Sequence, residues 1–172
     1  MDAFHLRYPI GKFKEPESYD AAFRNKAIRE IKAFPSKLKS QLLKLSSQEL
    51  EQAYRPGGWN GRQVVHHVAD SHMNAYTRFK LAMTESIPVI KPYNEAEWAV
   101  LSDTAMDIEV SVQLLKALHS RWAHFLESLS EASLKRSFRH PETGTIWNLD
   151  FALAQYDWHG NHHLGHLRLL EK

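Results

Sequence analysis

Four stretches of the chain place hydrophobic residues every three or four positions, with polar residues between them. This spacing is that of an amphipathic α-helix, so we predict four long helices. They are expected at about residues 18–34, 60–85, 107–130 and from 148 onward. The first pattern continues past Pro35 to Leu45. Because proline is tolerated at the first position of a helix, Pro35 is predicted to open a new one.

Pairs of polar residues mark where two helices begin. Ser46 is followed by Glu49, and Asn60 is followed by Gln63, and both pairs have the spacing of a capping box. We therefore predict a short turn of helix after Ser46 and the second long helix after Asn60. The chain before Pro16 is predicted to be an irregular arm.

Two segments lack the long helical period. Pro88 and Pro92 break the chain, and a short helix is expected at residues 94–101. Residues 138–147 place turn residues between short β-favouring runs, which predicts a small hairpin or loop before a final helix capped by Asn148. No long alternating strand pattern occurs. The sequence therefore predicts an all-α protein, a four-helix bundle that forms a single domain over residues 1–172.

The last helix carries four histidines on one side. His159, His162, His163 and His166 fall within about 100° of the helical wheel, and apolar residues border them on both edges. The stripe is therefore predicted to face the interior. Buried neutral imidazoles need partners for a donor and an acceptor nitrogen, and a shared cation can satisfy several of them. The stripe predicts a metal site, with a hydrogen-bonded histidine ladder as the alternative.

A further ligand is expected from another helix, because side chains of one helix reach only neighbouring positions. The second helix offers His66, His67 and His72. His72 lies at the centre of the apolar stripe, where a histidine bonded to backbone or to a hydroxyl is the favoured interpretation. His66 and His67 lie on opposite flanks, and the periodicity does not choose among the three. Surface or packing roles are predicted for the remaining histidines: His5, His119, His124 and His140.

The composition narrows the classes of function. Lys and Arg total 22 against 20 for Asp and Glu, a formal charge of +2, which is too balanced to predict binding to nucleic acid or to an anionic membrane. The absence of cysteine excludes disulfides, thiolate ligands and a cysteine nucleophile. No apolar run resembles a signal peptide or a membrane span, so a cytoplasmic protein is expected.

Several motifs occur in one order over nearly the whole chain: LRYPIG at 6–11, YRPGGW at 54–59, RQVVHHVADSHMN at 62–74, RFKL at 78–81, KPY at 91–93, HP at 140–141 and WHGNHHLGH at 158–166. With these motifs the chain resembles the DinB/YfiT-like superfamily of metal-dependent enzymes. The resemblance is strongest to the branch of bacillithiol S-transferases, earlier described as metal-dependent hydrolases.

The resemblance implies an up-down-down-up four-helix bundle, a homodimer and one divalent metal per chain. The ligands of that family are a histidine of the second-helix motif and a His-x-x-x-His pair on the last helix. These positions match His67, His159 and His163. The chain departs from the pattern at Gly160 and Asn161, where relatives can carry another pair that includes a further histidine.

Three imidazoles leave a divalent cation, zinc or nickel, with open positions, as in catalytic sites. We favour transfer of a low-molecular-weight, bacillithiol-like thiol to an electrophilic small molecule, since a metal can hold such a thiol as the nucleophilic thiolate. The alternative is hydrolysis by metal-bound hydroxide, which would need a general base. The nearest carboxylates in the sequence are Asp70 and Asp157, and Asp157 points away. A non-catalytic metal-dependent binding or stress-response module is the third hypothesis.

Two arginines are candidate substrate-binding residues. Arg55 lies in the loop that leads into the second helix, and Arg78 lies on the same flank of that helix as His67. Guanidinium groups can bind the carboxylates of a small thiol in a bidentate manner. Ordinary salt bridges are the alternative role for both.

Overall fold

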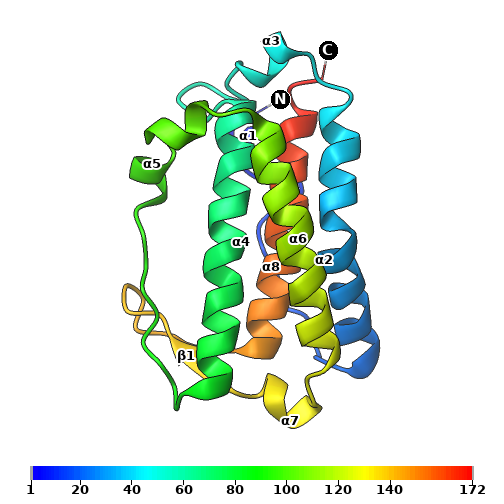
Figure 1. The fold of residues 1–172 in the computed structure, drawn as a ribbon, viewed down its shortest axis with the longest axis vertical. Helices are drawn as coiled ribbons and strands as arrows, with labels where there is room; N and C mark the ends of the chain where they lie inside the picture. The colour runs from blue at the N-terminus through cyan, green and yellow to red at the C-terminus, as the bar shows by residue number, and fades with distance from the viewer. Residues whose placement is uncertain (1, 172) are drawn as a thin grey trace.

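The computed structural model describes residues 2–171, and four long helices form its body (Figure 1). They are α2 (Ala21–Leu42), α4 (Gly61–Thr84), α6 (Ile108–Glu127) and α8 (Leu149–Arg168). α2 and α8 run in one direction and α4 and α6 in the other (Figure 1). α2 and α4 each pack against both α6 and α8. The all-α class, the four-helix bundle and the up-down-down-up order are thus confirmed.

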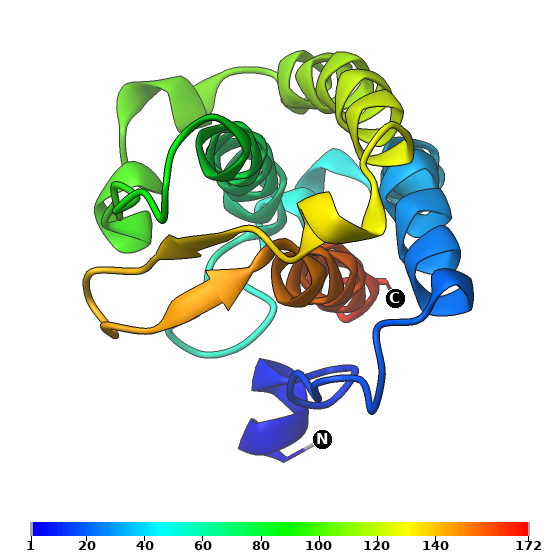
Figure 2. The same ribbon diagram turned by 90° about the horizontal axis from the view of Figure 1, so that it is seen from below.

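Shorter elements join the long helices. They are α1 (Ala3–Arg7), α3 (Ser47–Leu50), α5 (Glu95–Trp98), the 3₁₀ helix η1 (Ser102–Ala105) and α7 (Glu131–Leu134). The segment that holds α5 and η1 returns along the side of the bundle, so that α6 begins at the same end as α4 (Figure 1). β1 (Ser137–Arg139) and β2 (Ile146–Asn148) pair antiparallel in the predicted hairpin. The N-terminal segment lies outside the bundle beside α8 (Figure 2).

The predicted caps are present. The side chain of Asn60 accepts the N–H of Gln63 and completes a capping box at α4, and Ser46 and Glu49 do the same at α3. The Asn148 side chain accepts the N–H of Phe151 at the start of α8. These bonds satisfy N–H groups that a helix end leaves without partners. They involve residues at most three positions apart, which is why they could be predicted.

Other boundaries differ from the prediction. The arm before Pro16 is not wholly irregular, because Asp2 caps the short helix α1. The helix expected at 94–101 is confined to α5, and the 3₁₀ turn η1 follows it. The third long helix ends at Glu127 rather than near residue 130.

Pro35 does not open a new helix, because α2 continues through it. Proline has no N–H to donate to the carbonyl four residues earlier, which here belongs to Ile31. The Nδ1 atom of His119, on α6, lies 2.6 Å from that oxygen and bonds to it. A bond from a neighbouring helix thus replaces the missing helical one.

The core consists of two apolar clusters at different heights of the bundle. One is built around Trp122 and Phe79, the other around Phe34 and Leu115. Along α4, α6 and α8, histidines occupy the positions between the two clusters: His72, His119 and His159. The functional side chains therefore lie at the junction of two packed regions, where their surroundings are rigid.

A buried ion pair joins the start of α2 to the start of α8. Both oxygens of Asp150, which is fully buried, accept bonds from Arg24 at 2.7 and 2.8 Å, and Lys135 donates at 2.9 Å. Burial alone would raise the pKa of Asp150, but these bonds lower it. Two strong bonds of this kind fix the relative position of the helices.

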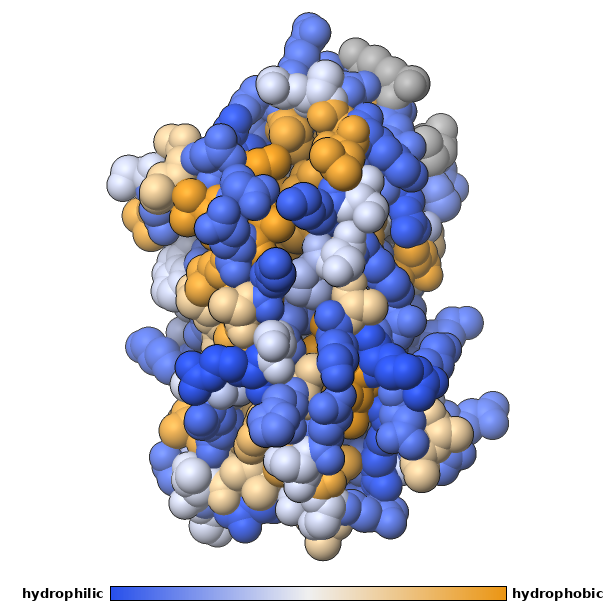
Figure 3. All heavy atoms as spheres, turned by 45° about the vertical axis from the view of Figure 1, so that its right-hand side comes forward, coloured by the Kyte–Doolittle hydropathy of each residue, from blue (hydrophilic) through white to orange (hydrophobic). Residues whose placement is uncertain are grey.

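The surface is predominantly polar, with hydrophobic residues gathered in the upper half of the face shown in Figure 3. Within residues 2–171, no helix has the length and apolar character needed to cross a membrane.

Candidate metal centre

Three histidines meet where α4 packs against α8. They are His67 of α4 and His159 and His163 of α8, and one ring nitrogen from each lies within 4.8 Å of the other two. The ring centre of His67 is 4.8 Å from that of His163 and 5.6 Å from that of His159. In the described part of the chain, this is the one group of three or more His, Cys, Asp or Glu side chains able to hold a metal ion.

Burial keeps these imidazoles neutral. It lowers the pKa of His67 to about 4, with a smaller contribution from the charge of His166. Burial and then the neighbouring imidazoles lower the pKa of His159 and of His163 well below the ordinary range. A neutral imidazole keeps a lone pair on one nitrogen, which is the form that binds a metal. Three such nitrogens from two helices suit a divalent cation.

Aromatic rings surround the cluster. Trp59 lies 4.6 Å from His67 between ring centres, and Tyr54 stacks on His166 at 4.0 Å. Trp158 stacks on His162 at 4.5 Å with an interplanar angle of 18°. Trp59 thus packs directly on the cluster, the other two rings pack on the histidines beside it, and all three limit rotation of the imidazoles that they contact.

The other histidines of α4 have different partners. His66 faces α6, where its Nδ1 lies 2.8 Å from Ser111 Oγ and its Nε2 lies 3.2 Å from the carbonyl oxygen of Met106. The sequence did not distinguish the two flanks of α4. In the structure, the flank of His66 faces α6 and that of His67 faces α8. His72 is buried and hydrogen-bonded, as expected, but the expected partners were wrong: it bonds to His119 and His159 rather than to backbone or a hydroxyl.

The two arginines predicted to bind substrate lie at separate places, and neither forms an ion pair with a described carboxylate. Arg78 is buried on α4 and donates to the hydroxyl of Tyr156 at 3.1 Å. Arg55 bonds to the carbonyl of Pro56, and its buried Nε has no partner in the described residues. The salt-bridge alternative is therefore wrong for both.

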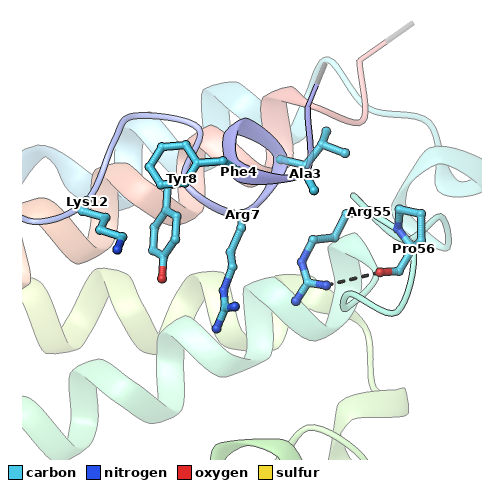
Figure 4. A pocket seen from close by; sticks show the side chains of 8 residues that line it. Ala3, Phe4, Arg7, Tyr8, Lys12, Arg55 and Pro56 are labelled. Atoms are coloured by element: carbon cyan, nitrogen blue, oxygen red, sulfur yellow. Dashed lines mark hydrogen bonds between the residues drawn. The ribbon is translucent and has the colours of Figure 1, made fainter.

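Arg55 lines a cavity of about 550 Å³ together with residues of the N-terminal segment. Arg7, Tyr8 and Lys12 contribute polar ends to it, and Figure 4 shows these side chains and Arg55 extending to the same side. The cavity adjoins the histidine stripe, since the carbonyl of Arg7 lies 3.2 Å from His166 Nε2 and the ring of Tyr8 lies 6.1 Å from that of His162.

Sequence reasoning missed these three residues. All of them lie in or next to the motif at 6–11, which carried the resemblance but had no assigned role. Their charge and spacing alone do not indicate a cavity, because its opposite wall is formed by Arg55 and Pro56.

No carboxylate joins the three-histidine group within residues 2–171. The pKa of Asp70, on α4, is raised to about 6, first by burial and then by the charge of Asp103. Asp157 accepts from Asn161 on the side of α8 that faces Glu30 and the lysines of α2. The centre thus consists of imidazoles, aromatic rings and a neighbouring cationic cavity.

Comparisons with known proteins agree with this arrangement. Residues 31–167 match the model of the DinB superfamily. A protein of Oceanobacillus iheyensis named "putative metal-dependent hydrolase" is 48% identical over 166 residues, which cover 96% of this chain and 96% of that protein. A protein of Bacillus mycoides with the same name is 47% identical over 167 residues, 97% of this chain and 96% of that protein.

One solved structure is also closely similar. It is YfiT from Bacillus subtilis, described as "a probable metal-dependent hydrolase with an unusual four-helix bundle topology". The TM-score is 0.93 at 44% sequence identity, with 96% of this chain and 95% of that chain covered.

Proposed function

The chain belongs to the DinB superfamily, and from this premise we propose that it is a metal-dependent enzyme that transfers a small thiol to electrophilic molecules. His67, His159 and His163 are its proposed ligands for one divalent cation, zinc or nickel. The observation that carries the proposal is the convergence of three neutral imidazoles from two helices, without a carboxylate ligand.

The donor set leaves room for a substrate. Three protein ligands are the number found in catalytic zinc sites, whereas structural sites have four. When bound, the cation supplies a positive charge that lowers the pKa of a thiol or of a water molecule. The protein's own contribution is to keep the imidazoles neutral by burial and to restrict His67 by packing Trp59 against it.

The neighbouring cavity favours an anionic cosubstrate. Arg7, Lys12 and Arg55 give it three cationic groups, and none of them forms an ion pair in the described residues. A guanidinium binds a carboxylate through two parallel hydrogen bonds. A thiol that carries carboxylates, such as one of the bacillithiol class, fits these charges. The absence of cysteine means that the sulfur must come from the cosubstrate.

Hydrolysis is the second candidate function. Asp70 favours it, because a carboxyl with a pKa of about 6 is suited to general-base catalysis near neutral pH. The names of the relatives also support it. A non-catalytic metal-dependent binding module is the third candidate.

One experiment separates these candidates. The metal-loaded protein is incubated with a haloaromatic or epoxide electrophile, with and without bacillithiol, and in parallel with ester and amide substrates. We expect turnover of the electrophile only with the thiol, and a raised KM for the thiol in Arg55→Met at unchanged metal content. Arg62→Met is a matched control, since Arg62 pairs with Glu51 away from the cavity. Ester or amide cleavage without any thiol would instead favour the hydrolase. Inactivity with both panels would favour the binding module.

The proposal includes a homodimer. Several large hydrophobic residues are exposed near α5 and the start of α6, and such a group suits a contact between proteins: Val100, Leu101, Met106, Val110 and Leu114. Light scattering of the purified protein should give twice the mass of the 19.9 kDa chain.

A further inference from the structure

We propose that His72 and His119 are positioning residues, which fix the orientation and the tautomer of His159 through a chain of hydrogen bonds that starts at a backbone carbonyl. The inference rests on the proposed metal site, because it explains which nitrogen of His159 faces the cation. His72 and His119 themselves lie outside the three-histidine group.

Three contacts make up the chain. His119 Nδ1 lies 2.6 Å from the carbonyl oxygen of Ile31, and His119 Nε2 lies 2.8 Å from His72 Nδ1. His72 Nε2 in turn lies 3.2 Å from His159 Nδ1. Both intermediate rings have no exposed surface, so no water competes for these nitrogens. The chain links α2 to α8 by way of α6 and α4.

The bond between His119 and the carbonyl of Ile31 determines which nitrogen donates in each of the following hydrogen bonds. A carbonyl oxygen can only accept, so Nδ1 of His119 must carry the hydrogen. The oxygen of Ile31 is accessible to an imidazole because Pro35 cannot donate to it. The proline inside α2 thus creates the fixed end of the chain.

Counting hydrogens then determines every other position. Each of the two contacts between imidazoles requires one hydrogen, since two N–H groups or two lone pairs cannot face each other. The three contacts therefore hold three hydrogens, and three neutral rings carry three. None remains for Nε2 of His159. That atom keeps its lone pair, and it is also the atom left free to join the metal ligands.

The opposite direction would need a fourth hydrogen. If His119 carried hydrogens on both nitrogens, His72 would donate through Nε2, and His159 would accept at Nδ1. The hydrogen of His159 would then occupy Nε2 and block it. Burial opposes this charged form, because neither His119 nor His72 has any exposed surface and no described carboxylate acts on either ring.

A shorter chain of the same kind supports His163. His166 Nε2 lies 3.2 Å from the carbonyl oxygen of Arg7, which can only accept, so the hydrogen of His166 is on Nε2. The Nδ1 of His166 then accepts from Nδ1 of His163 at 3.4 Å. Nε2 of His163 is left with its lone pair. Both proposed ligands of α8 are thus oriented from a backbone carbonyl, His159 through two other histidines and His163 through one.

The first test measures metal affinity in matched variants. Ni²⁺ or Zn²⁺ binding is followed by competition with a chromogenic chelator. His119→Leu and His72→Leu remove the chain, while His119→Gln keeps a donor and an acceptor on one side chain. We expect the leucine variants to bind metal about 10- to 100-fold more weakly, as is usual when a partner of a metal-bound histidine is lost. His119→Gln should recover most of the affinity.

His66→Leu is the control, since His66 is also a buried histidine of α4 and is hydrogen-bonded to α6, but it lies outside the three-histidine group. It should bind metal as the unaltered protein does. Unchanged affinity in both leucine variants would overturn the inference. An equal loss in His119→Gln and His119→Leu would also overturn it, because only the volume of the ring would then matter.

The second test uses the unaltered, metal-free protein, so it does not depend on the folding of any variant. ¹⁵N NMR of the imidazoles distinguishes protonated from unprotonated ring nitrogens. We expect hydrogen on Nδ1 and none on Nε2 of His159, and the reverse finding would refute the chain. If the protein bound no metal but showed this tautomer, the proposed function would be wrong, while the inferred chain of hydrogen bonds would be supported.

Discussion

At the scale of single residues, the four histidines on one face of α8 have three different kinds of contact. His159 and His163 meet His67, His162 stacks on Trp158, and His166 bonds to the carbonyl of Arg7. The helical period predicted the common face because it depends only on spacing. It could not assign the contacts, which depend on residues of other elements. The three that meet are those implied by the resemblance.

His119 is a stronger example of contacts that the helical period cannot predict. Its two partners, Ile31 and His72, are 88 and 47 positions away in the sequence. Spacing within α6 therefore gave no indication of its role, and a surface or packing role was the prediction. The available signal was Pro35 within a helical period that continues past it, together with a histidine elsewhere in the chain. This signal indicates a hydrogen bond between the two helices only when their positions in the fold are known.

Metal content tests the proposed ligands one at a time. His159→Ala and His163→Ala each remove one of three ligand nitrogens, so the purified proteins should contain almost no metal by elemental analysis. His162→Ala is the control on the same helix face, because His162 stacks on Trp158 and lies outside the group. It should keep a full complement. Full occupancy of both ligand variants would show the assignment to be wrong.

At the scale of elements, local signals predicted helix starts and missed contacts between elements. The caps at Asn60 and Asn148 depend on residues three positions away and were predicted correctly. The continuity of α2 through Pro35 involves a contact with α6, and the sequence did not predict it. The packing of the N-terminal segment is another contact between elements, and glycine is what permits it. A Cβ at Gly165 would lie 2.8 Å from Pro9 Cγ and 3.3 Å from Ile10 Cγ2.

Gly165→Ala therefore tests how closely the N-terminal segment must pack on α8. Alanine would normally stabilise a helix interior by about 1 kcal/mol relative to glycine. Here overpacking costs about 1–3 kcal/mol and outweighs that gain, so we expect a net destabilisation of up to about 2 kcal/mol. Urea unfolding measures the free energy.

The control for Gly165→Ala is its combination with Pro9→Ala, which removes the Cγ atom that lies nearest. The double variant should be more stable than the sum of the two single changes predicts. Strict additivity would mean that the segment does not press on α8 in solution.

At the scale of the whole molecule, the order of the helices around the core was not contained in their amphipathic patterns. Four helices with one apolar stripe each can form several bundles, and the long return between α4 and α6 decides among them. Only the resemblance implied the order that is observed. Once folded, the bundle encloses an unusual number of imidazoles, and this has a consequence for its stability in acid.

The metal-free protein should lose stability as the pH falls from about 6.5 towards 4. Burial lowers the pKa of four imidazoles to about 4: His67, His119, His162 and His166. Between these values the unfolded chain binds more protons than the folded one, so unfolding becomes easier. Each such proton contributes about 1.4 kcal/mol per pH unit. Asp70 and Asp157, whose pKa values are raised to about 6, act in the opposite sense but are fewer.

Urea unfolding at pH 7, 6 and 5 checks this expectation. Against a total stability of about 5–15 kcal/mol, typical of a protein, the metal-free form should show a measurable fall in the free energy of unfolding between pH 7 and pH 5. A flat profile over that range would mean that the imidazoles are not buried as neutral groups. Bound metal should shift this loss of stability to lower pH, because it stabilises only the folded form.

The layer of histidines between the two apolar clusters also restricts how the helices can slide along one another. Hydrophobic contacts tolerate many axial alignments, since one leucine packs nearly as well as the next. The chain through His119, His72 and His159 tolerates only one, because a shift of a single turn would leave buried nitrogens without partners. A lone polar layer in an apolar core is known to select one register at some cost in stability. In this bundle the residues that prepare a metal ligand would also select the alignment of the helices, so the precision of the site and the uniqueness of the fold have a common origin.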